Sequence, residues 1–265
     1  MTVSTTRRYE DILSRVCAGP EGSRPRRLWT ALAAAGLLAT ACGPASAATI
    51  LRVAHTATLL TNGDMLIAGG VDETETTLFS ADIFAASRGD LIVPSGSMAV
   101  ARASHTATLL PNSCVLVFGG NTAGPLAAPA PTNLPEIYNP VTNLWTSLGA
   151  LGTARYNHTA TLLNDGRVLL CGGQDGAGNA IASCEFYTPG ASCAVGAFTA
   201  APSLLQARYN HTATLQKDGK VWFAGGRNPA VAGHYLPTTE RYDPATNAFQ
   251  SGSPLIEARA HHTAP

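Results

Sequence analysis

The sequence predicts an all-β fold assembled from repeated units, on three observations. A phrase of the form Arg-x-x-His-Thr-Ala-Thr-Leu recurs along the chain, each complete copy continues to an apolar run that ends in Gly-Gly, and no unit shows a helical period. The repeated histidines are His55, His105, His158, His211 and His262, spaced 50, 53, 53 and 51 residues apart. A fixed period of about 50 residues indicates a repeat architecture.

Each unit is expected to hold four short strands. The repeated phrase is rich in Thr and alternates, and short apolar runs such as 65–68 follow it, with Asn62-Gly63, Asp165-Gly166 and Asp218-Gly219 as hairpin turns between the two. A Glu-x-Tyr-x-Pro element and then an aromatic residue supply the third and fourth strands. The third-strand elements are 136–140, 185–189 and 240–244, with a degenerate copy at 82–84, and the closing aromatics are Trp145, Phe198 and Phe249.

These units predict a β-propeller, because one small sheet cannot bury both of its faces without neighbouring sheets. The domain is expected to cover residues 48–265. Its four units are 52–101, 102–154, 155–207 and 208–258, and residues 259–265 begin a fifth.

The order of Gly-Gly, Glu-x-Tyr-x-Pro and a closing aromatic resembles the kelch family. The phrase with Arg-x-x-His-Thr-Ala-Thr-Leu is similar to bacterial exported kelch proteins grouped with the central domain of galactose oxidase. The resemblance implies that the first strand of each blade is innermost, and that rings have six or seven blades. Four units with the start of a fifth therefore predict an incomplete ring, from a truncated product or a fragment. The alternative is an open arc that another chain completes.

Residues 1–47 are interpreted as an export signal. Six arginines lie in 1–27, and the uncharged apolar run 28–41 that follows has 14 residues, fewer than the roughly 20 that span a bilayer. The segment 39–42, Ala-Thr-Ala-Cys, resembles a bacterial lipobox and predicts lipidation of Cys42. The alternative is cleavage after the Ala-Ser-Ala of 45–47 by ordinary signal peptidase, which would discard Cys42.

The balance of charged residues bears on which partners the protein is expected to bind. There are 17 Lys and Arg against 17 Asp and Glu, and only 13% of residues are charged. This gives no electrostatic reason to expect nucleic acid as a partner. We expect an exported protein, periplasmic, extracellular or anchored as a lipoprotein, that meets the membrane only through a lipid on Cys42 and binds a protein or a carbohydrate.

The repeated residues are predicted to be structural. A metal site needs different ligands that converge on one point, whereas the histidines recur at one place in every blade. A galactose-oxidase-like copper radical oxidase is the enzymatic alternative. Tyr156 and Tyr209, however, each lie two residues before a repeated histidine, and no cysteine matches the family's cross-linked one. No catalytic residue, metal ligand or cofactor is carried over.

The cysteines of an exported protein can form disulfides. Cys184 and Cys193 are expected to flank the turn between the third and fourth strands of their unit. This predicts a Cys184–Cys193 bridge. Pairing with Cys114 or Cys171 is the alternative. The segment 175–179, Asp-Gly-Ala-Gly-Asn, lacks the acidic spacing of a calcium loop and is expected to be a plain turn.

The variable segments after Gly-Gly are the candidate binding surface. They cover 71–81, 121–135, 174–183 and 227–239, and they should emerge on one face of the propeller. Arg227, His234 and Tyr235 are the non-repeated polar or aromatic residues of the fourth segment. The sequence thus favours a non-catalytic kelch propeller that binds its ligand at the bacterial cell surface.

Overall fold

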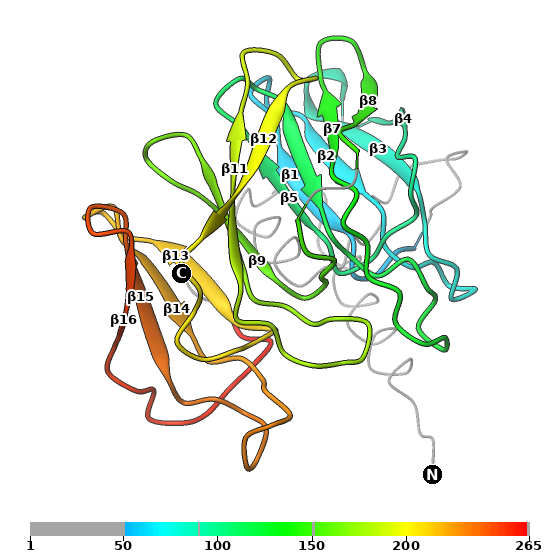
Figure 1. Cartoon of the computed structure of the whole chain (residues 1–265). Helices are drawn as coiled ribbons and strands as arrows, with labels where there is room; N and C mark the ends of the chain where they lie inside the picture. The colour runs from blue at the N-terminus through cyan, green and yellow to red at the C-terminus, as the bar shows by residue number, and fades with distance from the viewer. Residues whose placement is uncertain (1–50, 90, 150–151, 264–265) are drawn as a thin grey trace, which may run out of the picture. The chain divides into compact units, whose positions relative to one another are not determined.

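The computed structural model describes residues 51–89, 91–149 and 152–263, which form four antiparallel sheets of four strands (Figure 1). Each sheet keeps its strands in chain order, and one short 3-10 turn, η1 (Ala86–Arg88), is the helix in this part of the chain. Blade 1 holds β1 (Thr56–Leu59), β2 (Met65–Ala68), β3 (Ser80–Ala85) and β4 (Leu91–Ser97); blade 2 holds β5 (Thr106–Leu109), β6 (Val115–Phe118), β7 (Glu136–Asn139) and β8 (Leu144–Ser147); blade 3 holds β9 (Thr159–Leu162), β10 (Val168–Cys171), β11 (Cys184–Pro189) and β12 (Gly196–Ala201); blade 4 holds β13 (Thr212–Leu215), β14 (Val221–Ala224), β15 (Thr239–Asp243) and β16 (Ala248–Ser251).

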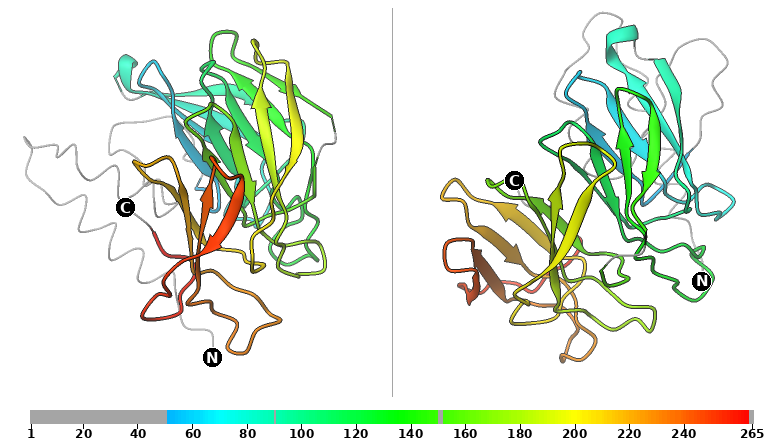
Figure 2. Two further views of the ribbon diagram at one scale, coloured as in Figure 1. Left: turned by 60° about the vertical axis from the view of Figure 1, so that its left-hand side comes forward. Right: turned by 45° about the horizontal axis from the view of Figure 1, so that its top comes forward.

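The predicted kelch-type propeller blades are confirmed. The first strands β1, β5, β9 and β13 contact one another in sequence, and the two further views show the blades following each other around them (Figure 2). The sheets do not close into a ring within the described residues. The repeated phrase thus forms the innermost strand of every blade, as the family resemblance implied.

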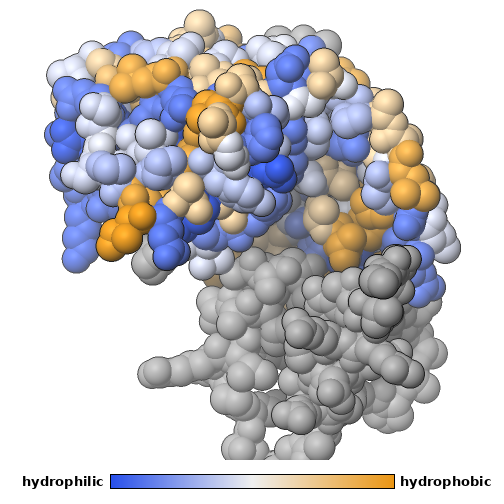
Figure 3. Space-filling view, turned by 90° about the horizontal axis from the view of Figure 1, so that it is seen from below, coloured by the Kyte–Doolittle hydropathy of each residue, from blue (hydrophilic) through white to orange (hydrophobic). Residues whose placement is uncertain are grey.

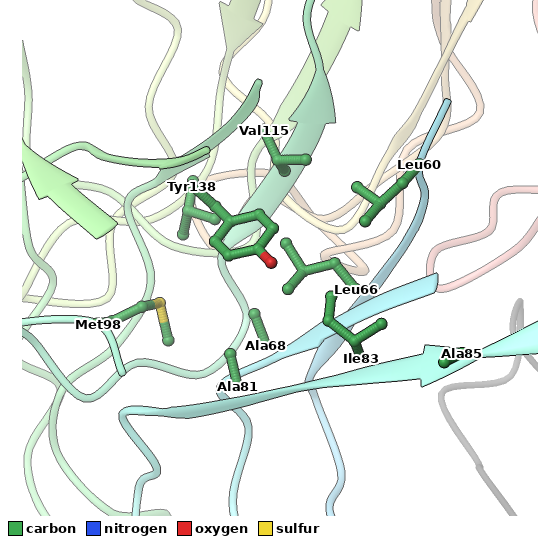
Figure 4. Packing of buried hydrophobic residues seen from close by; sticks show 10 residues of the cluster. Leu60, Leu66, Ala68, Ala81, Ile83, Ala85, Met98, Val115 and Tyr138 are labelled. Atoms are coloured by element: carbon green, nitrogen blue, oxygen red, sulfur yellow. The ribbon is translucent and has the colours of Figure 1, made fainter. Parts of the chain in front are cut away.

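Apolar side chains fill the spaces between successive blades. Tyr138 and Val115 of blade 2 pack against Leu66 and Ile83 of blade 1, with Met98 at the side of the cluster (Figure 4). Strand alternation directs one set of side chains to the preceding blade and the other set to the following blade. Seen from below, the surface mixes hydrophilic residues with separate hydrophobic patches (Figure 3).

The Gly-Gly doublets bring neighbouring blades into backbone contact. Gly119 and Gly120 have φ angles of 65° and 99°, which favour glycine. A Cβ atom on Gly120 would lie 2.8 Å from the Cβ of His105, and the Gly120 amide donates to the carbonyl of Arg155 in the next blade at 2.9 Å. The doublets thus permit a backbone bend and close packing between blades.

A buried ion pair braces each blade. Arg102 Nη2 lies 2.6 Å from Glu136 Oε1, and Arg102 Nη1 donates to the carbonyl of Gly119 at 2.9 Å. The Glu136 carboxylate also accepts from the amides of Ala99 and Val100, which lead from blade 1 into blade 2. The equivalent pairs are Arg52–Asp82, Arg155–Glu185 and Arg208–Glu240. The repeated arginine is therefore structural, and Asp82 of the degenerate first copy takes the place of the glutamate.

Blade 4 departs from the pattern on the face turned away from blade 3. In the first three blades this face has two opposed apolar residues from the second and third strands, buried in each case: Leu66 and Ile83, Leu116 and Ile137, Leu169 and Phe186. Trp222 and Arg241 take these places in blade 4, and Arg241 donates to Gln250 Oε1 at 2.9 Å. This face is thus partly polar.

Candidate binding site

The loops between second and third strands emerge at the edge of each sheet where the inner strand begins. In every blade the residue after Gly-Gly pairs through isolated antiparallel bridges with a residue before the inner strand and with the far arm of its loop. This residue is Val71, Asn121, Gln174 and Arg227 in blades 1 to 4. The same backbone frame therefore presents a different side chain in each blade.

In blade 4 this frame assembles a cationic and aromatic cluster. Arg227 bridges to both Tyr209 and Tyr235, and its Cζ lies 5.8 Å and 5.0 Å from the centroids of their rings. These distances fit cation–π interactions. Tyr209 is buried, whereas Tyr235 is 45% exposed. The structure thus brings together two of the three residues that the sequence singled out and adds Tyr209, which the sequence interpretation assigned to the repeated architecture.

His234 has a different role from its neighbours. Its φ is 62°, its amide donates to the carbonyl of Val231, and its own carbonyl accepts from the amide of Asn228. The imidazole is exposed and forms no hydrogen bond with other described residues. His234 therefore shapes the loop with its backbone and does not join the Arg227 cluster.

Blade 3 contributes a second polar group beside the cluster. Tyr156 bridges to Gln174, whose Oε1 accepts from Asn157 Nδ2 at 3.2 Å and whose Nε2 donates to the carbonyl of Gly178 at 3.1 Å. Burial, followed by the proximity of Tyr209 and of an aspartate, raises the pKa of Tyr156. Tyr209 of blade 4 therefore lies close to Tyr156 of blade 3.

A polar pocket of about 240 Å³ lies next to these tyrosines. It is lined by Ser104, His105, Asn157, His158, Asn210, His211, His261 and His262. Asn157 and Asn210 directly follow Tyr156 and Tyr209 in the chain, and the Asn210 amide donates to the Asn157 carbonyl at 3.1 Å. The pocket lining therefore adjoins Tyr209 along the chain, through Asn210.

The repeated histidines connect neighbouring blades. Thr106 Oγ1 shares a hydrogen bond of 2.9 Å with His158 Nε2, and Thr159 Oγ1 shares one of 2.9 Å with His211 Nε2. Burial, and then the nearby Arg208 charge, lower the pKa of His211 to about 3. Among the described residues, no three His, Cys, Asp or Glu side chains are grouped to hold a metal ion. The hydrogen bonds to threonine give these histidines contacts between neighbouring blades.

Two disulfides replace the predicted Cys184–Cys193 bridge, which is wrong. Cys114 pairs with Cys193, and Cys171 pairs with Cys184. Cys184 begins β11 and lies directly opposite Cys171 of β10, with 4.2 Å between their Cα atoms, whereas Cys193 lies in the turn at the other end of β11. The length of a strand therefore separates Cys184 from Cys193. The Cys114–Cys193 bridge instead joins blade 2 to blade 3.

The loop at 175–179 is a plain turn, as expected. The Asp175 carboxylate accepts from the amides of Ala177 and Asn179 and from the Asn179 side chain, and these hydrogen bonds lower its pKa. Its oxygens thus close the loop on itself.

The predicted export signal lies outside the described residues, and so does Cys42. No helix among the described residues has the length and apolar character that a membrane span requires.

One of the comparisons with known proteins, a sequence relative, agrees with the repeat fold. No family model matches the chain. Beta-scruin of Limulus polyphemus, a kelch-repeat protein, is 28% identical over 137 residues, which make up 50% of this chain and 14% of that protein. A solved fungal alcohol oxidase of the AA5 family, in complex with copper, matches with a TM-score of 0.49 at 16% identity, over 79% of this chain and 55% of its own. The chain thus spans only part of either protein.

Proposed function

We propose that this chain is an exported, non-catalytic kelch-type propeller module that binds a protein or a carbohydrate at the bacterial cell surface. The observation that carries the proposal is the cluster of Tyr209, Arg227 and Tyr235, which blades 1 to 3 lack at the same position. A polar pocket adjoins Tyr209 along the chain. Loops on a rigid scaffold commonly supply binding residues. The repeated histidines and arginines meanwhile have structural contacts in every blade.

The two disulfides support export, because disulfides persist in oxidising compartments and are rare in the cytosol. The basic and apolar layout of residues 1–41 supports the same route. Lipidation of Cys42 would then hold the propeller at the membrane surface.

Expression with the native N-terminus in a bacterium tests this proposal. Palmitate labelling that disappears in Cys42→Ala, with a membrane-bound wild-type protein, supports the lipoprotein. A soluble exported product that begins after Ala47 supports the ordinary signal peptide instead. A cytoplasmic product with reduced cysteines contradicts export.

The alternative is a fragment of a copper radical oxidase, and measurement of bound copper distinguishes it from a binding module. Purified protein loaded with copper and then dialysed should lose the metal if the chain is a binding module. Retention of one copper per chain would favour the oxidase fragment.

A further inference from the structure

Resting on the proposed binding role, we infer that Arg227 and its two tyrosines recognise a carboxylate-bearing sugar, such as a hexuronate unit of an acidic glycan. The repeats provide an internal comparison for this inference. The residue after Gly-Gly occupies the same bridged position in all four blades, so its side chain can be compared from blade to blade.

In the first three blades the side chain at this position is either apolar or hydrogen-bonded within its own blade. Val71 is apolar. Asn121 donates to the carbonyl of Ala123 and accepts from the amide of Ala130 within its own loop. Gln174 accepts from a neighbouring asparagine and donates to a loop carbonyl. The side-chain amides of Asn121 and Gln174 thus already have hydrogen-bond partners within their own blades.

Arg227 differs from all three. Its Nε is buried and has no hydrogen-bond partner among the described residues, and no carboxylate within them forms an ion pair with it. By contrast, the arginine that begins each of the four blades has an acidic partner. Arg227 is half-buried, and a guanidinium without an anionic partner in the protein keeps its charge available, so this position favours an anionic ligand.

The aromatic rings hold the guanidinium in a defined orientation. Tyr209 and Tyr235 both lie within cation–π distance of Arg227, and the backbone bridges fix all three residues. A planar guanidinium held in this way matches a carboxylate through two parallel N–H···O bonds. Less side-chain freedom then remains to be lost when the ligand binds.

The surroundings favour a sugar over an acidic peptide. Tyr235 is 45% exposed, so part of its ring is available to pack against the C–H face of a pyranose. The adjacent pocket of about 240 Å³ is lined by hydroxyl, amide and imidazole groups, which suit sugar hydroxyls better than the apolar side chains of a peptide. One carboxylate for Arg227 and several hydroxyls for the pocket are the groups that an acidic glycan carries.

Calorimetric titration of the full chain with three probes tests the inference. The probes are a galacturonate hexamer, its methyl ester, which keeps the sugars and removes the charges, and poly-L-glutamate, which keeps the charges and removes the sugars. We expect the hexamer to bind, the ester to bind about tenfold or more weakly, and poly-L-glutamate to bind no better than the ester.

Variants assign the effect to the site. Arg227→Gln should weaken hexamer binding about tenfold or more without changing binding of the ester, and Arg227→Lys should fall between it and the wild type because the paired N–H geometry is lost. Arg241→Gln is the matched control, since this arginine of the same blade is hydrogen-bonded to Gln250. Thermal melts of each variant check that the blades remain folded.

The outcomes separate the inference from the proposed function. Equal binding of hexamer and ester, or an equal loss in Arg227→Gln and Arg241→Gln, overturns carboxylate recognition at this site and leaves the binding module standing. Binding of poly-L-glutamate in place of the hexamer overturns the sugar assignment and favours a protein partner. If none of the three probes binds, the inference fails, and the proposed function then depends on the export and copper experiments.

Discussion

Acid should destabilise this propeller through its buried histidines. Burial, with the charge of an adjacent arginine, lowers the pKa of His105 and of His211 to about 3. The pKa of His158 is lowered in the same direction and for the same causes. Because an unfolded histidine titrates near pH 6.5, the unfolded chain binds protons that the folded chain does not. The free energy of unfolding therefore falls as pH drops from about 6.5 towards 3.

The expected magnitude follows from these values. Each histidine with a folded pKa near 3 lowers the free energy of unfolding by about 2 kcal/mol between pH 7 and pH 5. His105 and His211 together therefore lower it by about 4 kcal/mol. Carboxylates with lowered pKa values titrate below this window; they are Asp72, Asp165, Asp175 and Asp243. Asp82 acts in the opposite sense, because burial raises its pKa.

Urea unfolding at pH 7, 6 and 5, followed by tryptophan fluorescence, measures the effect. Near pH 5 each buried histidine should contribute a slope of about 1.3 kcal/mol per pH unit to the free energy of unfolding. His211→Gln should remove about one such contribution. An unaltered slope in His211→Gln would show that this histidine is not held neutral by burial, and the reasoning would be refuted.

Three further predictions concern stability. Gly120→Ala should destabilise by more than 2 kcal/mol, because its Cβ would lie 2.8 Å from the Cβ of His105, and by clearly more than Gly63→Ala, whose Cβ meets nothing within 4 Å; equal losses in chemical denaturation would contradict this. Glu136→Ala should cost about 3–5 kcal/mol by leaving a buried guanidinium unpaired, and a double variant that also carries Arg102→Met should recover part of the loss; a strictly additive cycle would disprove the coupling. Cys193→Ser should lower stability by about 4.5 kcal/mol on the chain-entropy scale for a 79-residue loop, and peptide mapping that finds Cys193 on a different cysteine would overturn the pairing.

The fold was predictable because the repeats multiply a weak local signal. One His-Thr-Ala-Thr-Leu segment is compatible with many strands, but its recurrence with Gly-Gly and Glu-x-Tyr-x-Pro identifies a blade. The repeated arginine and glutamate also prove to be partners in space, as in Arg208 and Glu240 at 2.6 Å. Residues that recur together at fixed spacing form the same contact in every blade.

Predicting the disulfides and part of the site required the exact strand boundaries and the pairing between strands, which the sequence does not give. Placing Cys184 at a turn required knowing where β11 begins, and the structure begins that strand at Cys184 itself. Cys114 and Cys193 are 79 residues apart, so only the stacking of blades brings them together. Tyr209 was assigned to the architecture because Tyr156 repeats it. Its position before the inner strand holds Val53 and Ala103 in the first two blades, and this variation was the available signal.

The division between repeated and varied residues explains why a binding site can arise without disturbing the blades. The contacts that join one blade to the next use backbone carbonyls, the Gly-Gly doublet and the threonine–histidine pairs, so the side chain after Gly-Gly is not needed for stacking. Blade 1 places Val71 there and blade 4 places Arg227, with the same bridges on either side. A cation that would be costly in an interblade core is tolerated at this edge, because two tyrosine rings contact it. The varied position is therefore where binding specificity can change at little cost to the fold.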